Sequence, residues 1–232
     1  MLVKICGATA ADEVELLASA GADLVGVWHG VPGGRTELSP RQLSDLAAAA
    51  HRTGRVRPVL VTFLNDAAAL RDVLARARID WVQLHGYQTP GTVRALKDTG
   101  GPTVVKVVHL GPGGAAACPE LPLIRSYERA GTDLFLIDAT TADGRLGSTA
   151  RQLDGRAVLD VVDRMSRPFL LAGGITGDSG PGHRAVVEHP LFRGIDVDTA
   201  AKDPGSGRIR AERVADVVRG WRTAGGGPEE AA

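Results

Sequence analysis

A thiol and a carboxyl group are the two side chains of this sequence best suited to proton transfer. Cys6 lies beside Gly7 after a short β-rich run, Leu2–Ile5, and Asp138 follows another, Leu134–Ile137. A thiolate base and a carboxylic acid on opposite sides of a substrate accelerate proton transfer by roughly 10²–10⁴-fold. Each residue also has a structural interpretation, Cys6 as a small buried apolar side chain and Asp138 as a cap or turn residue.

Polar or glycine residues also follow several other β-rich runs. In a parallel barrel, such positions at the carboxyl ends of strands carry binding and catalytic groups. Gln83 and His85 flank Leu84 and therefore point to the same side of their strand, where they either fill a barrel or support a site. His109 is expected to be a loop residue, and the spacing of the six histidines predicts no metal site. The candidates for substrate binding are Arg35, Gln83, His85, Gly173, Gly174, Asp196, Asp198 and Thr199.

Eight short apolar runs predict the strands that position these groups. They are Leu2–Ile5, Leu24–Trp28, Pro58–Phe63, Trp81–Leu84, Val104–Val108, Leu134–Ile137, Phe169–Ala172 and Ile195–Val197. Segments with helical spacing lie between or after them: Ala11–Ala20, Pro40–His51, Ala67–Arg78, Pro90–Thr99, Leu121–Ala130, Arg156–Met165, His183–His189 and Ala211–Arg222. Because parallel strands need a crossover at each step, this alternation predicts an α/β fold, a single (β/α)8 TIM barrel. A doubly wound open sheet is the competing architecture.

Composition and charge favour one globular domain that acts on a small molecule. Of the 232 residues, 44% are hydrophobic, and we expect a barrel domain over residues 1–222 with a disordered tail over 223–232. The 27 basic and 27 acidic residues cancel, so nothing favours nucleic acid or an anionic membrane. No apolar run approaches the roughly 20 residues that span a bilayer. No secretory leader and no disulfide framework are evident, and we expect a cytoplasmic monomer or homodimer.

The motifs together resemble the phosphoribosylanthranilate isomerases of tryptophan biosynthesis, and the chain looks like a divergent member of that family. The resemblance covers roughly residues 2–220, with the motifs in the right order. The matching segments are Lys4-Ile5-Cys6-Gly7, Arg35 with Leu38-Ser39-Pro40, Val82-Gln83-Leu84-His85-Gly86, Leu136-Ile137-Asp138, Leu171-Ala172-Gly173-Gly174-Ile175 and Gly194-Ile195-Asp196-Val197.

The resemblance implies an isomerase that performs an Amadori rearrangement, an intramolecular aldose–ketose oxidoreduction that needs no cofactor. The substrate would be an N-linked aminoaldose carrying anthranilate. Asp138 would be the general acid that protonates the furanose ring oxygen, and Cys6 the general base that removes the C2 proton from the resulting Schiff base. Arg35 would hold the anthranilate carboxylate, and Asp196 would bind sugar hydroxyls.

The sequence departs from the family around the substrate's phosphate. Gly173 and Gly174 keep half of a phosphate site. After the eighth strand, however, Asp198-Thr199-Ala200 stands where the family usually has Ser-Ser-Gly. A carboxylate about 4 Å from a phosphate charge costs roughly 4 kcal/mol at an effective dielectric near 20, unless another group compensates. The nearby cations available for compensation are Lys202, Arg208 and Arg210.

A second departure follows the sixth strand, where Gly147-Ser148-Thr149-Ala150 replaces a more glycine-rich family segment. One alternative is therefore a paralogue in specialised metabolism that acts on a related anthranilate or arylamine glycoside. A second is a lyase or synthase such as indoleglycerol-phosphate synthase. This sequence has no lysine after the first strand, where such chemistry would need one, but it has Lys106 on the fifth. A third is a non-catalytic barrel that binds an aromatic acid. Cys6 argues against the bifunctional isomerases that also serve histidine synthesis, which have an aspartate at this position.

Overall fold

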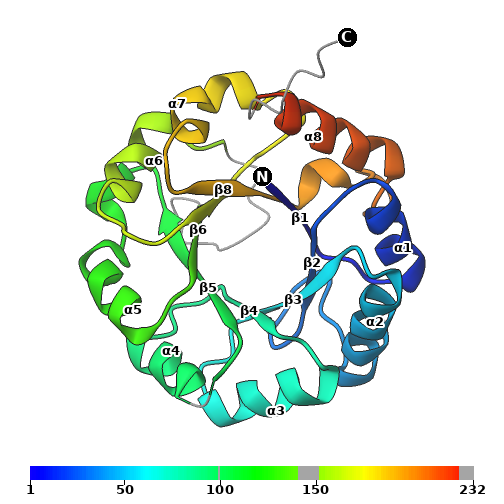
Figure 1. The fold of residues 1–232 in the computed structure, drawn as a ribbon. Helices are drawn as coiled ribbons and strands as arrows, with labels where there is room; N and C mark the ends of the chain where they lie inside the picture. Colours follow the sequence, from blue (N-terminus) through cyan, green and yellow to red (C-terminus); the bar gives the residue numbers. More distant parts are fainter. Residues whose placement is uncertain (99, 141–151, 225–232) are drawn as a thin grey trace.

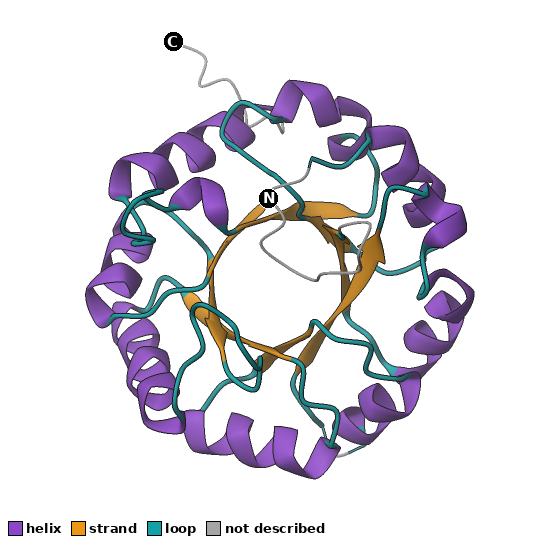
Figure 2. Cartoon of the chain, turned by 180° about the vertical axis from the view of Figure 1, so that it is seen from behind, coloured by secondary structure: helices purple, strands orange, loops and turns teal. Residues whose placement is uncertain are grey.

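The eight strands of the protein form one closed parallel barrel in sequence order, surrounded by helices (Figures 1 and 2). The computed structural model describes residues 1–98, 100–140 and 152–224. The strands are β1 (Leu2–Cys6), β2 (Leu24–Trp28), β3 (Arg57–Thr62), β4 (Trp81–Leu84), β5 (Thr103–Leu110), β6 (Leu134–Ala139), β7 (Phe169–Leu171) and β8 (Phe192–Val197). Pairing of β1 with β8, with Lys4 opposite Asp196, closes the barrel and excludes the open sheet.

Each predicted helix is present with small differences at its ends. The α-helices are α1 (Ala11–Ser19), α2 (Pro40–Thr53), α3 (Ala67–Ala77), α4 (Pro90–Lys97), α5 (Ile124–Ala130), α6 (Gly155–Val162), α7 (Arg184–Val187) and α8 (Ala211–Ala224). The last helix extends two residues past the expected domain boundary, and the rest of the expected tail, 225–232, lies outside the described residues. Within the described part of the chain, no helix is long and apolar enough to cross a membrane.

Local sequence signals fix where helices begin and end. At the start of α2, the Ser39 hydroxyl accepts from the Gln42 amide while the Gln42 side chain accepts from the Ser39 amide, which forms a capping box. Pro40 occupies the first turn, where its missing amide proton costs nothing. Gly54 ends the helix at φ 62°, a left-handed conformation that favours glycine.

Strand side chains alternate between two cores. The outward side chains pack against the helices in a large apolar core, and a smaller core fills the inside of the barrel. The buried members of this inner core are Val105, Val107, Leu134, Leu136, Leu170 and Ala172. Inward positions nearer the carboxyl ends of the strands are polar, among them Cys6, Gln83 and Asp138. The fold therefore gathers its reactive side chains at one end of a packed cylinder.

Candidate active site

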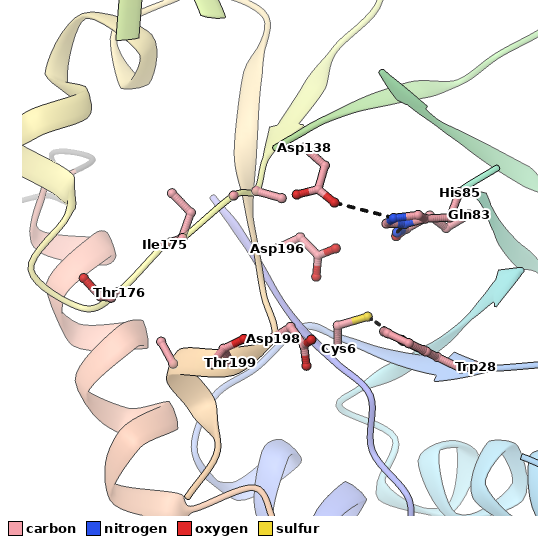
Figure 3. Close-up of a pocket in the computed structure, with 14 residues that line it drawn as sticks. Cys6, Trp28, Gln83, His85, Asp138, Ile175, Thr176, Asp196, Asp198 and Thr199 are labelled. Carbon is pink, nitrogen blue, oxygen red and sulfur yellow. Dashed lines mark hydrogen bonds and ion pairs between the residues drawn. The ribbon is translucent and has the colours of Figure 1, made fainter. Parts of the chain in front are cut away.

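A cavity of about 170 Å³, here called the inner pocket, opens at the carboxyl end of the barrel (Figure 3). Every predicted site residue except Arg35 lines it. These residues are Cys6, Gln83, His85, Asp138, Gly173, Gly174, Asp196, Asp198 and Thr199. Arg35 instead lines an adjoining cavity of about 650 Å³, here called the outer chamber, which also contains Lys202, Arg208 and Arg213.

Cys6 ends β1 with its thiol facing the inner pocket, and 5% of the residue is exposed. The indole Nε1–H of Trp28 donates to Cys6 Sγ at 3.0 Å. Gly26 on β2 makes room for the sulfur, because a Cβ at this position would lie 2.6 Å from Sγ and 3.0 Å from the Lys4 ammonium. The thiol therefore sits between an indole donor and a buried cation.

That cation, Lys4, forms a buried ion pair across the closing seam of the barrel. Its Nζ donates to both carboxylate oxygens of Asp196, at 2.8 and 2.9 Å. Burial lowers the pKa of Lys4, but the charge of Asp196 and the nearby Cys6 outweigh burial, and the net shift is upward. Burial also pushes the pKa of Asp196 up, yet two short contacts to one ammonium are the geometry of an ion pair.

The same surroundings keep the Cys6 thiol protonated in the free protein. Burial raises the pKa of Cys6 to about 11; Lys4 opposes this rise, while Asp196 and Asp198 add to it. A thiolate at this position therefore needs additional positive charge from a bound ligand.

Asp138, near the end of β6, is placed to hold a proton at neutral pH. One of its oxygens accepts from the Ala139 amide at 2.8 Å, and 7% of the residue is exposed. Burial, reinforced by the charges of Asp196 and Asp198, raises the pKa of Asp138 to about 7. A carboxylic acid with a pKa near the working pH combines availability of the proton with strength as an acid.

Two side chains from the end of β4 lie beside Asp138: Gln83 belongs to the strand, and His85 directly follows it. Gln83 Nε2 lies 3.0 Å from His85 Nδ1, and His85 Nε2 lies 3.5 Å from the Asp138 carboxylate (Figure 3). Burial, and then the charge of His109, lowers the pKa of His85, so the ring is neutral. If Gln83 donates to Nδ1, Nε2 carries the ring proton and faces Asp138, where it has no closer partner among the described residues.

The loops after β7 and β8 form the opposite wall of the inner pocket. Gly173 and Gly174 have φ values of 81° and 64°, which other residues rarely adopt. Asp198 forms an ion pair with Lys202, one of the three cations considered as compensation for it. Arg208, a second of them, pairs instead with Asp12 and Glu13, at 2.7 and 3.0 Å.

Two buried groups differ from what the sequence suggested. The expectation that His109 belongs to a loop is wrong: it lies within β5, and its Nδ1 is 2.6 Å from a carboxylate oxygen of buried Glu120. Lys106 faces away from the inner pocket. Its ammonium donates to the Gly86 and Val107 carbonyls at 2.7 and 2.8 Å. Lys106 is thus not placed for the chemistry of a lyase or synthase.

Lys4 and Trp28 are the site residues that the sequence interpretation missed. Strand periodicity contained a signal for Lys4, because it lies two residues before Cys6 and so shares its face. Nothing in the sequence connects Trp28 with Cys6, since their contact depends on the register between β1 and β2. Among the described residues, no group of three or more histidine, cysteine or acidic side chains has the arrangement of a metal site.

Comparison with known proteins agrees with this geometry. Residues 3–200 match the family model for N-(5'-phosphoribosyl)anthranilate isomerase. The chain is 32% identical over 227 residues to the enzyme of that name from Afipia carboxidovorans, covering 95% of this chain and 87% of that protein. It is likewise 32% identical over 228 residues to the enzyme from Rhodopseudomonas palustris, covering 92% and 99%.

Solved structures confirm the fold. The isomerase from Pyrococcus furiosus superposes with a TM-score of 0.74 at 21% identity, covering 96% of this chain and 99% of that one. A phosphoribosyl anthranilate isomerase solved with reduced 1-(o-carboxyphenylamino)-1-deoxyribulose 5-phosphate gives a TM-score of 0.71 at 22% identity, covering 96% and 100%. From its family match and its relatives over nearly the whole chain, the protein belongs to the N-(5'-phosphoribosyl)anthranilate isomerase family.

Proposed function

We propose that the protein converts N-(5'-phosphoribosyl)anthranilate into 1-(o-carboxyphenylamino)-1-deoxyribulose 5-phosphate, with Asp138 as general acid and Cys6 as general base. The observation that carries this assignment is that both side chains line one small cavity, from β6 and β1 of the same barrel. Membership of the isomerase family supports the reaction, and the pKa of about 7 for Asp138 supports its role as the acid.

The first step opens the sugar. Asp138 gives its proton to the furanose ring oxygen, the bond from C1 to that oxygen breaks, and the nitrogen lone pair forms a C1=N iminium. Asp138 is left as a carboxylate and the substrate gains a positive charge. Asp196 and Asp198 also face this pocket, and fixed carboxylates favour a cation that develops beside them.

The second step moves the C2 proton. Cys6 accepts it, and the C–H electron pair becomes the C1=C2 bond of an enolamine as the iminium nitrogen regains its lone pair. The enolamine then takes a proton at C1 from solvent while its C2 hydroxyl gives a proton to the Asp138 carboxylate, which yields the ketone and restores the acid. The reaction is an internal isomerisation, because C2 is oxidised while C1 is reduced.

The thiol becomes a base only when positive charge approaches it. The free protein holds Cys6 as a thiol. In the ring-opened intermediate the iminium supplies that charge, and the thiol releases its own proton to solvent before it takes the C2 proton. Lys4 lowers the pKa of Cys6, and the Trp28 indole N–H stabilises a thiolate by donating to the sulfur. We infer that Lys4 and Trp28 are positioning residues for the base.

Complementation tests this function. Expression in a tryptophan auxotroph that lacks its own isomerase should restore growth, and Cys6→Ser should abolish the rescue. Cys118→Ser is the matched control, because Cys118 is equally buried and does not line the inner pocket. A folded, soluble wild-type protein that fails to support growth would overturn the proposal.

One observation favours a second candidate, the same rearrangement on a related arylamine glycoside. Asp198 lies at the carboxyl end of β8, next to where a phosphate is expected, and makes that position less favourable for an anion. Failed complementation together with turnover of an unphosphorylated arylamine glycoside would identify this activity.

We also propose a cytoplasmic protein that is a monomer or homodimer. The phosphoribosylanthranilate isomerase from Thermotoga maritima is described as dimeric, with monomers generated from it, and this supports the homodimer. Light scattering coupled to size exclusion distinguishes the two states.

A further inference from the structure

The inner pocket is acidic. Asp138, Asp196 and Asp198 line it, and among the described residues no lysine or arginine does. Lys4 pairs with Asp196 and Lys202 with Asp198, but both ammonium groups lie outside the lining. Uncharged sugar hydroxyls or a cationic iminium suit such a pocket, whereas the two negative charges of a phosphate are repelled by it.

The outer chamber is basic. Its lining has four cationic residues, Arg35, Lys202, Arg208 and Arg213, against two acidic ones, Asp198 and Asp203. Lys202 and Arg208 are occupied by ion pairs within the protein. Arg35 and Arg213 have no hydrogen bond or ion pair with any described residue, so two guanidinium groups face this chamber with their donors available.

The two cavities adjoin near the thiol. They share a wall, made by Trp28, Thr176, Asp198, Thr199 and Ala200. Gly7, directly after Cys6, lies against the Lys202 ammonium and the Thr36 hydroxyl, which would be 2.5 and 3.1 Å from a Cβ at this position. That hydroxyl is buried and has no partner among the described residues.

We propose that Arg213, which lines the outer chamber together with Arg35, is a further substrate-binding residue and contributes a second guanidinium to an oxyanion subsite there. In this arrangement the neutral sugar reacts in the acidic inner pocket, while a negatively charged end group extends past the shared wall to Arg213. A guanidinium fork matches the planar or tetrahedral oxygens of a carboxylate or phosphate. The inference rests on the proposed function, because it takes the substrate to be an aminosugar with anionic end groups.

Two anionic groups of that substrate share this chemistry, the aryl carboxylate and the sugar phosphate. The test therefore uses the reduced product analogue in three forms: complete, without its phosphate, and without its carboxylate. Calorimetric titration of the wild type and Arg213→Gln measures each affinity. We expect Arg213→Gln to weaken the complete analogue about tenfold, because an exposed charged hydrogen bond is lost. The loss should vanish for the analogue that lacks the group held by Arg213.

Arg210→Gln is the matched control. It removes the same charge three residues away from an exposed position that lines neither cavity. Affinity should change less than twofold in this variant. Equal losses in the two variants, or a loss at Arg213 that persists with both truncated analogues, would overturn the subsite.

Failure of the proposed function gives a different result. If the wild type binds the complete analogue without catalysing the rearrangement, and Arg213→Gln weakens that binding, the result supports the subsite and refutes the proposed activity. If the analogue does not bind, anthranilate and inorganic phosphate are titrated separately. Binding of either one that Arg213→Gln weakens supports the subsite alone, and no binding of any of these anions overturns both proposals.

Discussion

The inner pocket and the outer chamber share a wall but differ in charge, because acidic side chains line the first and mainly basic side chains line the second. In the inner pocket, ionisable side chains are buried inside the barrel, and burial is the largest cause of the pKa shifts of Cys6 and Asp138. In the outer chamber, Arg35 and Arg213 are exposed cations without internal partners. On the proposed function, one end of this fold separates proton transfer, which needs shifted pKa values, from anion binding, which needs only available charge.

Removing the reactive groups of the inner pocket should have the largest effect. We expect Cys6→Ser and Asp138→Asn each to lower kcat by about 10²–10⁴-fold with little change in affinity for the reduced product analogue, since each removes one proton transfer. Steady-state kinetics and calorimetry measure the two quantities. Arg213→Gln should do the reverse, raising KM while keeping kcat. A fall in kcat for Arg213→Gln as large as for Cys6→Ser would contradict the assignment of proton transfer to the inner pocket and anion binding to the outer chamber.

Ion pairs in the two regions should differ strongly in their contribution to stability. Lys4→Met leaves the Asp196 carboxylate buried without its partner, which should lower the free energy of unfolding by about 3–5 kcal/mol. Asp12→Asn breaks only the exposed pair between Asp12 and Arg208 and should cost less than about 1 kcal/mol. Urea denaturation measures both. Asp196→Leu added to Lys4→Met should recover stability but not activity, and equal losses for the two single variants would contradict the comparison.

The pH dependence of the rate should report the inner pocket. Because Asp138 must carry its proton to open the ring, kcat/KM should fall about tenfold per pH unit above the pKa of about 7. Burial raises this pKa, so between about pH 4 and 7 only the folded state retains the proton, and stability should decrease as the pH rises through that range. Rate profiles and denaturation series from pH 5 to 9 measure both effects. A kcat/KM that stays constant from pH 6 to 9 would contradict the assignment of Asp138 as the general acid.

Most of the barrel was predictable because its signals are local. Alternating apolar runs and helical spacing predicted all eight strands and all eight α-helices, which differ from the predictions mainly at their ends. The error at His109 has a physical cause: β5 continues to Leu110, and the Glu120 carboxylate supplies the partner that a buried histidine needs. A sequence window does not show a partner that arrives from eleven residues away.

The sequence by itself determined which side chains end the strands and which of them share a face, because strand periodicity is a local property. On that basis Cys6, Asp138 and Asp196 were candidates, and the family resemblance supplied the roles expected of them. Only the tertiary structure decided that Lys4 would meet Asp196, that Trp28 would donate to Cys6, and that Arg35 would face a separate basic chamber. The physical reason is closure of the barrel: it joins β1 to β8, and it supplies the burial that shifts the pKa values of Cys6 and Asp138.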